Sequence, residues 1–154
     1  LFLLLIAAIA FSGVGLDVLL TAIIYWILIN GLLSAAFTFI AGGHPFSAAT
    51  AFAVSWMTSL NPLLAAGWFA AIVEAKIRKP ASGEIRQIME AETFSEMRRI
   101  PLFRVVLVAA LANVGSSIGT FAYFLFIFPV LGIDPSVVIG DGFSNMLQAI
   151  AGLL

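Results

Sequence analysis

The chain of 154 residues contains no cysteine, which excludes disulfide bonds and thiolate metal sites. Its single histidine, His44, cannot form a zinc site by itself, because catalytic zinc takes three protein ligands. We therefore predict no metal site and no cofactor.

Charge is also scarce, since only 10% of the residues are charged and the formal net charge is -1. Binding to nucleic-acid phosphates requires a patch or stripe of Lys and Arg, and a chain with slightly more acidic than basic residues does not suggest one. The sequence therefore argues against a nucleic-acid partner.

Motifs of intramembrane proteases are missing as well. The sequence GSSIG at 115–119 is not the serine arrangement of rhomboid-type enzymes, and VIGDG at 138–142 lacks the first glycine of the GxGD aspartyl pattern. No HExxH is present. We expect no catalytic residue and no enzymatic activity in this segment alone.

Hydrophobic residues are what the chain has in excess. They make up 62% of the sequence, and the mean hydropathy of +1.15 lies far outside the range of soluble domains. Apolar runs near or above the roughly 20 residues that span a bilayer recur along the chain. These runs predict an all-α, polytopic protein of the cell membrane with about four to five transmembrane helices, whose partner is the lipid bilayer.

We predict one membrane domain over 1–154, with at least one broken helix. Its first segment is too short to span, so we interpret it as the end of a longer helix that follows a missing upstream domain. The expected segments are a truncated helix at 1–11, a span at 16–40, a span at 46–75 broken near 61–62, an amphipathic loop at 76–100, and spans at 101–130 and 136–154.

Residues 76–104 contain all seven Lys and Arg residues. The positive-inside rule predicts that this segment is cytoplasmic, which places the turns GGHP at 42–45 and GIDP at 132–135 outside. Within it, Ile85, Ile88 and Met89 share one helical face, and TFSE at 93–96 fits a capping box. Two short interfacial helices are therefore expected.

Uncharged polar residues and one acid fall near a common depth. At 1.5 Å per residue, Asn30, Asn61 and Asn113 lie roughly 14 to 22 Å from the presumed cytoplasmic ends of their spans. Unsatisfied polar atoms cost several kcal/mol in hydrocarbon, so we expect these side chains to converge. The predicted polar layer, a candidate ligand site, comprises Asn30, Asn61, Asn113, Ser116, Ser117 and Asp141.

The Asn61-Pro62 pair resembles an N-cap followed by a first helical position. We predict that a half-helix from Pro62 to Ala75 begins there, and that NVGSS at 113–117 unwinds to face it. Several transporters hold ions or anionic substrates at such a discontinuous helix.

The polar layer also has a purely structural interpretation, which stays open as an alternative to a ligand site. Asn and Ser side chains also bond across membrane helices for packing, and Gly67, Gly115 and Gly119 belong to small-xxx-small pairs. A homo-oligomer formed through the GxxxG face is one form of it. We also favour an ion pair of Glu74 with Arg78 over catalysis, and a structural or solvated His44 over a ligand.

Four stretches resemble a known family: YWILINGLLSA, HPFSAATAF, TSLNPLLAAGWFAAIVEAKIRKP and RVVLVAALANVGSSIGTF. They are similar to the carboxyl-terminal membrane region of the TraB/PrgY pheromone-shutdown family, and cover most of residues 20–122. Members carry a soluble amino-terminal domain related to the Tiki and GumN proteins, to which a metal-dependent protease activity is ascribed. None of its motifs occurs here.

The resemblance implies a membrane domain that anchors an external domain, and that external domain inactivates peptide pheromones. A further implied role of the membrane domain is to assist the external domain. Two other functions remain open. One is a transporter or channel-like module that binds an ion or small solute at the polar layer, and the other is a purely structural oligomerising anchor.

Overall fold

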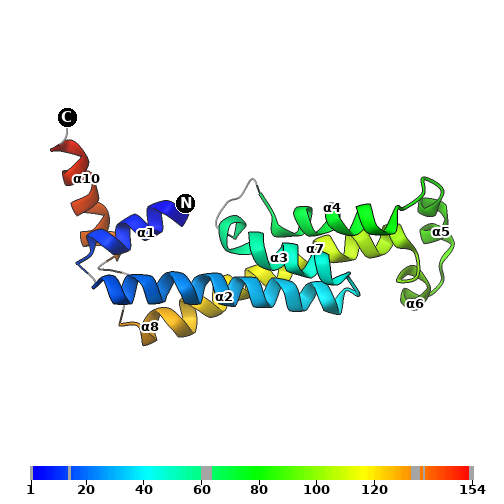
Figure 1. Cartoon of the computed structure of the whole chain (residues 1–154), viewed down its shortest axis with the longest axis horizontal. Coiled ribbons are helices and arrows are strands. Elements are labelled where there is room, and N and C mark those ends of the chain that lie inside the picture. Colours follow the sequence, from blue (N-terminus) through cyan, green and yellow to red (C-terminus); the bar gives the residue numbers. More distant parts are fainter. Residues whose placement is uncertain (1, 14, 60–63, 133–135, 137, 153–154) are drawn as a thin grey trace. The chain divides into compact units, whose positions relative to one another are not determined.

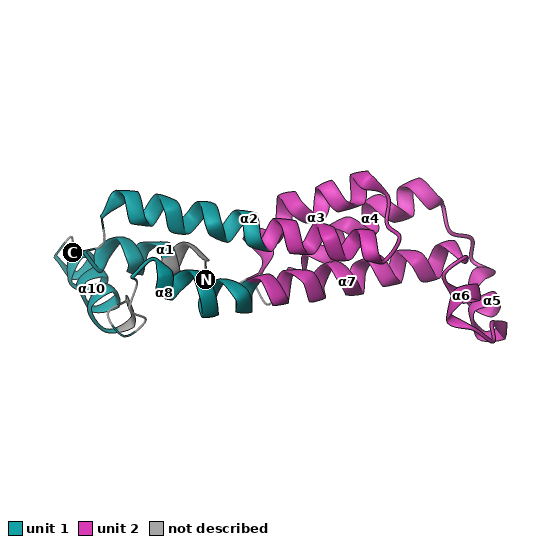
Figure 2. Cartoon of the chain, turned by 90° about the horizontal axis from the view of Figure 1, so that it is seen from below, with its two compact units in different colours: residues 1–29, 120–154 teal, residues 30–119 magenta. Residues whose placement is uncertain are grey.

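The computed structural model describes residues 2–13, 15–59, 64–132, 136 and 138–152, and within these ranges every regular element is a helix (Figure 1). The all-α prediction is therefore confirmed for the described part of the chain. Two compact units are present, one of residues 1–29 and 120–154 and one of residues 30–119 (Figure 2). Two helices, Leu16–Ile40 and Pro101–Val130, are long and apolar enough to cross a membrane by length and composition.

Unit 1 gathers α1 (Phe2–Phe11), the first part of α2 (Leu16–Ile40), the π-helix η1 (Tyr123–Ile127) with α8 (Phe128–Val130), and η2 (Val138–Gly142) with α10 (Phe143–Ala151). Buried Trp26 meets Tyr123 edge to face at 5.0 Å between ring centroids. The hydroxyl of Tyr123 donates to the Ala22 carbonyl at 3.1 Å. This bond satisfies the polar end of a buried aromatic side chain.

Unit 2 contains the rest of α2, α3 (Pro45–Thr58), α4 (Ala66–Arg78), α5 (Glu84–Glu90), α6 (Phe94–Met97) and most of α7 (Pro101–Ala122). Pro45 suits the first turn of α3, where its missing N–H removes a donor that has no partner in the helix. The His44 side chain caps this helix by accepting from the Phe46 N–H at 3.2 Å. His44 thus has a structural role.

Helices α3 and α4 form an antiparallel hairpin (Figure 1). The buried carboxylate of Glu74, near the end of α4, accepts from the His44 N–H at 2.8 Å and from the Ser47 hydroxyl at 2.6 Å, both at the start of α3. It also pairs with Arg78 one turn later, as the sequence predicts. One carboxylate therefore joins the end of α4 to the start of α3.

Arginines from the basic segment bind the end of α2. Arg78 donates to the Gly42 carbonyl at 3.0 Å, and Arg98 donates to the Ile40 carbonyl at 3.1 Å. The last carbonyls of a helix have no partner within it and form the negative end of its dipole, so cationic donors stabilise them. The α2–α3 turn and the basic segment consequently lie at the same end of unit 2.

Placing the GGHP turn opposite the basic segment was therefore wrong. A 14-residue helix and a 13-residue helix extend only about 21 and 20 Å, and they run in opposite directions instead of following one another across the protein. The chain after Ile40 runs away from the basic segment along α3 and then runs back toward it along α4. Length alone does not reveal this reversal.

The connection between α4 and α7 holds the two expected short helices, α5 and α6. Thr93 accepts from the Glu96 N–H at 3.2 Å, which confirms the predicted capping box. The Glu92 N–H, which donates to Glu96, and the Thr93 hydroxyl lower the pKa of the Glu96 carboxyl. Buried Glu84 accepts from the Leu102 N–H at 2.7 Å and so caps the start of α7.

Replacing Glu74 with alanine should destabilise unit 2 by about 3 kcal/mol, because the half-buried guanidinium of Arg78 and the two donors at the start of α3 lose their acceptor. Chemical or thermal unfolding in detergent measures this loss. Glu90 provides a matched control, since it forms the same i,i+4 pair with Arg86 on an exposed surface. Its alanine variant should stay within about 0.5 kcal/mol of the wild type. Equal effects of the two variants would contradict the role of Glu74.

Candidate functional site

A chain of hydroxyl and amide groups joins three segments of unit 2 beside the end of α3. Ser59, which directly follows α3, lies 2.9 Å from Asn30 Oδ1 on α2 and 2.7 Å from Ser116 Oγ on α7. A serine hydroxyl carries one proton, so Ser116 donates to Ser59 when Ser59 donates to Asn30. Asn30 is fully buried. Three helices are thereby joined by polar side chains.

The start of α4 is capped by a side chain from another helix. The N-cap residue, Ala65, is extended and offers no side-chain acceptor. Instead, Asn113 Oδ1 on α7 accepts from the Gly67 N–H at 2.7 Å. One of the donors that every helix leaves unpaired in its first turn is therefore satisfied from across the bundle.

Glycines permit this close approach of the helices. A Cβ on Gly67 would lie 2.0 Å from the Ala109 carbonyl oxygen, and one on Gly115 would lie 2.5 Å from the Leu33 carbonyl oxygen. Both neighbours are backbone atoms that have little room to shift. The structure thus places Gly67 between α4 and α7 and Gly115 between α7 and α2, while Gly119 is buried on the same helix.

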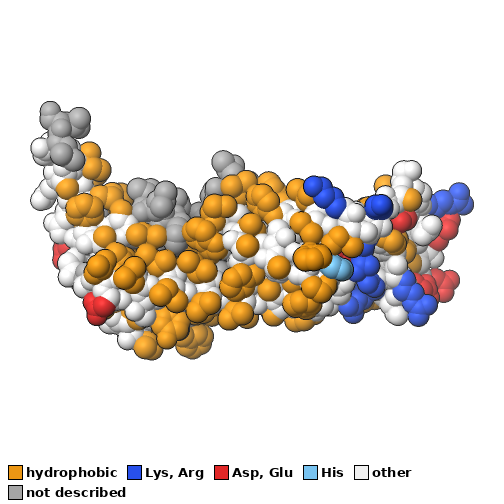
Figure 3. Space-filling model, viewed as in Figure 1, with side chains coloured by type: hydrophobic (Ala, Val, Ile, Leu, Met, Phe, Trp, Pro, Cys, Tyr) orange, Lys and Arg blue, Asp and Glu red, His pale blue; other side chains and the backbone are white. Residues whose placement is uncertain are grey.

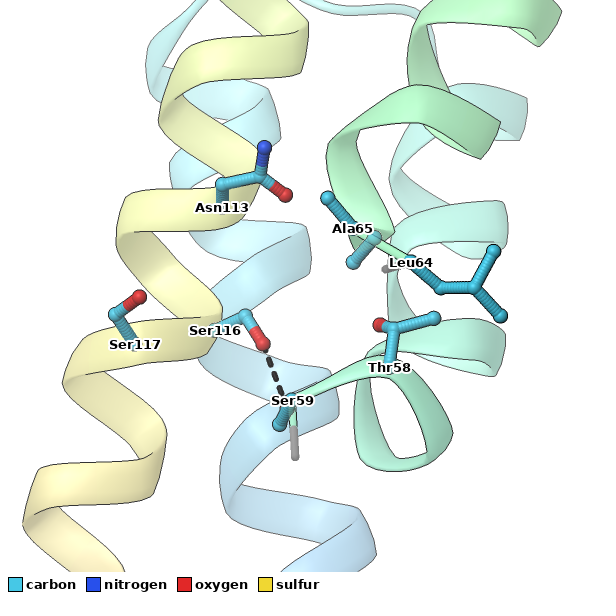
Figure 4. A pocket seen from close by; sticks show the side chains of 8 residues that line it. Thr58, Ser59, Leu64, Ala65, Asn113, Ser116 and Ser117 are labelled. Carbon is cyan, nitrogen blue, oxygen red and sulfur yellow. Dashed lines mark hydrogen bonds between the residues drawn. The ribbon is translucent and has the colours of Figure 1, made fainter. Parts of the chain in front are cut away.

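A cavity of about 280 Å³ opens beside these bonds at the tip of the hairpin (Figure 4). In that view the Asn113 amide points across toward Ala65, and Ser116 points to Ser59. The cavity is lined by Thr58, Ser59, Leu64, Ala65, Ala66, Asn113, Ser116 and Ser117. None of these eight described residues carries a formal charge.

Four residues of the predicted polar layer meet in this region. Asn30 and Ser116 belong to the hydroxyl and amide chain, and Asn113 and Ser117 line the cavity. Asn61 lies outside the described residues. Asp141 belongs to unit 1, where its side chain is exposed, and its membership of the layer stays a prediction.

Two local predictions were wrong. Helix α4 begins at Ala66 after the extended residue Ala65, so residues 62–75 do not form the continuous half-helix that was predicted; Pro62 itself lies outside the described residues. The NVGSS segment does not unwind, because α7 is α-helical throughout Pro101–Ala122. Close packing explains the second result: a helical Gly115 fits directly against α2, and Asn113 reaches α4 from an intact helix.

The sequence reasoning missed Thr58 and Ser59. Together with Ser55, they occupy positions i, i+3 and i+4, which form one stripe on a helix. A polar stripe in an apolar helix points toward protein, so this spacing carried a usable signal. Within the described residues, no group of three or more His, Asp or Glu side chains is placed to hold a metal ion.

Comparison with known proteins gives two matches. A family model described as "TraB family protein, C-terminal domain" matches residues 1–132. The chain is also similar to an uncharacterized protein of Methanocaldococcus jannaschii, with 42% identity over 98 residues that cover 62% of this chain and 25% of that protein. The match thus spans a quarter of the relative's length. No solved structure matches the chain significantly.

Substituting Gly67 with alanine should cost about 1–3 kcal/mol, because the new methyl group meets the Ala109 backbone and forces α4 away from α7. Unfolding in detergent measures the change. Gly83 is the control: a Cβ there meets nothing within 4 Å, so its alanine variant should change stability by no more than about 0.5 kcal/mol. A Gly67→Ala variant as stable as Gly83→Ala would rule out the close packing.

Proposed function

The chain belongs to the TraB family as its C-terminal domain, and from this premise we propose that it is a multi-pass membrane domain that anchors a longer protein. The remainder of that protein is the part that inhibits peptide pheromones in this proposal. We expect no catalysis by the domain itself. The observation that carries the proposal is an inverted distribution of polar and apolar side chains.

Helix α2 displays this inversion most directly. Its large aliphatic side chains are exposed, with 52% for Leu20, 55% for Ile24 and 58% for Leu32. In the second half of the helix the polar side chains Asn30, Ser34 and Thr38 are all 0% exposed, whereas Asp17 and Thr21 near its start are not buried. A helix on the surface of a soluble domain has the opposite arrangement. A helix with a lipid-facing apolar side and a polar side turned toward its neighbours fits a membrane.

The same inversion extends over unit 2. Hydrophobic side chains cover much of its surface, and Lys and Arg gather at the end that carries α5 and α6 (Figure 3). With that end cytoplasmic by the positive-inside rule, α2 and α7 are the proposed membrane crossings and α3 with α4 is a re-entrant hairpin. Polar groups at membrane depth are tolerated where protein or water satisfies them, which suits Ser59 and Gly67, whose bonds to α7 lie at the ends of α3 and α4.

The oligomeric-anchor alternative has less support. Gly115, a member of the GxxxG pair, already packs against Leu33 of α2 in the same chain. That face is therefore used for folding the domain. A role in binding a small solute is favoured by a separate observation, the polar cavity.

Anchoring is tested with the full-length protein and a variant that lacks this domain. After an alkaline carbonate wash, the full-length protein should stay in the membrane pellet, because α2 and α7 remain in the bilayer, whereas the variant should appear in the supernatant. The response of pheromone-sensitive cells provides the second readout, and the deletion should restore it. A deletion variant that stays in the washed pellet would contradict the anchoring role.

The re-entrant hairpin makes its own prediction about sidedness. Single cysteines at Phe46 and Lys79, both exposed, should react with a membrane-impermeant thiol reagent added to the same side of oriented vesicles. A cysteine at exposed Leu16, at the other end of the 25-residue helix α2, should react from the opposite side. Labelling of positions 46 and 79 from opposite sides would show that 45–78 crosses the membrane and would exclude the hairpin.

A further inference from the structure

We infer that the cavity at the hairpin tip binds a small, uncharged, hydrogen-bonding solute from water that reaches the interior of the membrane domain. The inference rests on the proposed membrane location and adds a ligand class to it. It depends on three features of the cavity, which are its size, the unused hydrogen-bonding capacity of its walls, and its lack of charge.

The size fits a small molecule together with water. A volume of 280 Å³ corresponds to about nine water molecules at roughly 30 Å³ each. Cavities that stay empty in proteins are lined by apolar side chains, whereas polar cavities of this size hold water. Five of the eight lining residues carry side-chain hydroxyl or amide groups, so this cavity belongs to the hydrated class.

Hydrogen-bonding groups remain available on its walls. Asn113 uses its carbonyl oxygen for the Gly67 N–H, and its amide nitrogen has no partner within the described residues. Ser117 is exposed, and its hydroxyl also has no hydrogen-bond partner among the described residues. Thr58 donates to the carbonyls of Val54 and Ser55, which leaves its oxygen free to accept. The walls thus offer both donors and acceptors.

The absence of charge on these walls selects the ligand class. Divalent cations take oxygen ligands that usually include carboxylates, and none is present among the eight described residues that line this cavity. Carboxylate and phosphate groups are bound most strongly by Arg or Lys, which are also missing from the lining. Neutral amide and hydroxyl groups match an uncharged solute that has one donor and one acceptor end. A primary amide has this pattern.

Cysteine scanning tests the inference, because the domain contains no cysteine and each introduced thiol is unique within it. In the full-length protein, with other cysteines replaced and the protein in liposomes, Ser117→Cys should react with an impermeant methanethiosulfonate reagent. The matched control is Ile118→Cys, whose side chain is 41% exposed but lies outside the cavity. It should react about tenfold more slowly, because a thiol against lipid does not ionise.

The ligand class is tested with acetamide and acetate, which have the same shape and differ in charge. Acetamide should slow labelling of Ser117→Cys along a saturating curve that reaches about half the initial rate when its concentration equals Kd. Acetate should have no effect, and neither compound should change labelling of Lys79→Cys. A second variant, Ala65→Cys, examines the opposite wall and guards against local damage at position 117.

Each other outcome overturns a defined part of the inference. If both Ser117→Cys and Ala65→Cys fail to react, the cavity is dry and the inference is refuted, while the membrane-anchoring proposal is unaffected. Equally fast labelling of Ser117→Cys and Ile118→Cys shows that α7 is not surrounded by lipid, so the proposed function fails. Protection by acetate alone refutes the uncharged class, and labelling that neither compound slows refutes solute binding.

Discussion

The carboxylate of Glu74 fixes the architecture of unit 2. It accepts from the His44 N–H and the Ser47 hydroxyl at the start of α3 while pairing with Arg78 on its own helix. Burying a carboxylate is costly unless donors surround it, so these three groups are required together. With the start of α3 and the end of α4 joined, the opposite ends of the two helices, at Ser59 and Ala66, lie beside α2 and α7. The position of the cavity follows from this constraint.

The hairpin tip creates a second requirement, because the ends of α3 and α4 carry backbone groups that no helix satisfies. Asn113 provides an acceptor for Gly67, and the absence of a side chain on Gly67 lets α4 approach α7 closely enough for this bond. The close packing of α4 on α7 and the hydrogen bond that satisfies the Gly67 N–H therefore depend on each other. The sequence left open whether these residues serve packing or ligand binding. In the structure the same residues pack the helices and border the cavity, so the two roles are not assigned to different residues.

The helices, the capping box at Thr93 and much of the polar layer could be predicted, because each rests on local spacing or on the cost of a polar group in an apolar run. The direction of α3 and α4 could not. It depends on contacts between residues 27 and 30 positions apart, Ser47 and His44 with Glu74. Hydropathy does not distinguish a crossing from a return. The start of α4 was missed for a similar reason, since its cap comes from Asn113 on another helix.

Two opposing demands meet at the hairpin tip. Bonds from Ser59 and Asn113 hold α2, α4 and α7 together, and these bonds use only part of the polar capacity present. A site built for packing alone would gain by filling the remaining space with methyl groups, since apolar contacts in a close-packed interior stabilise without any hydrogen-bonding requirement. A cavity bordered by an amide nitrogen and a hydroxyl that lack partners among the described residues forgoes that stability. Polar groups left available in a cavity, at a cost in stability, are typical of sites that bind a small molecule from water.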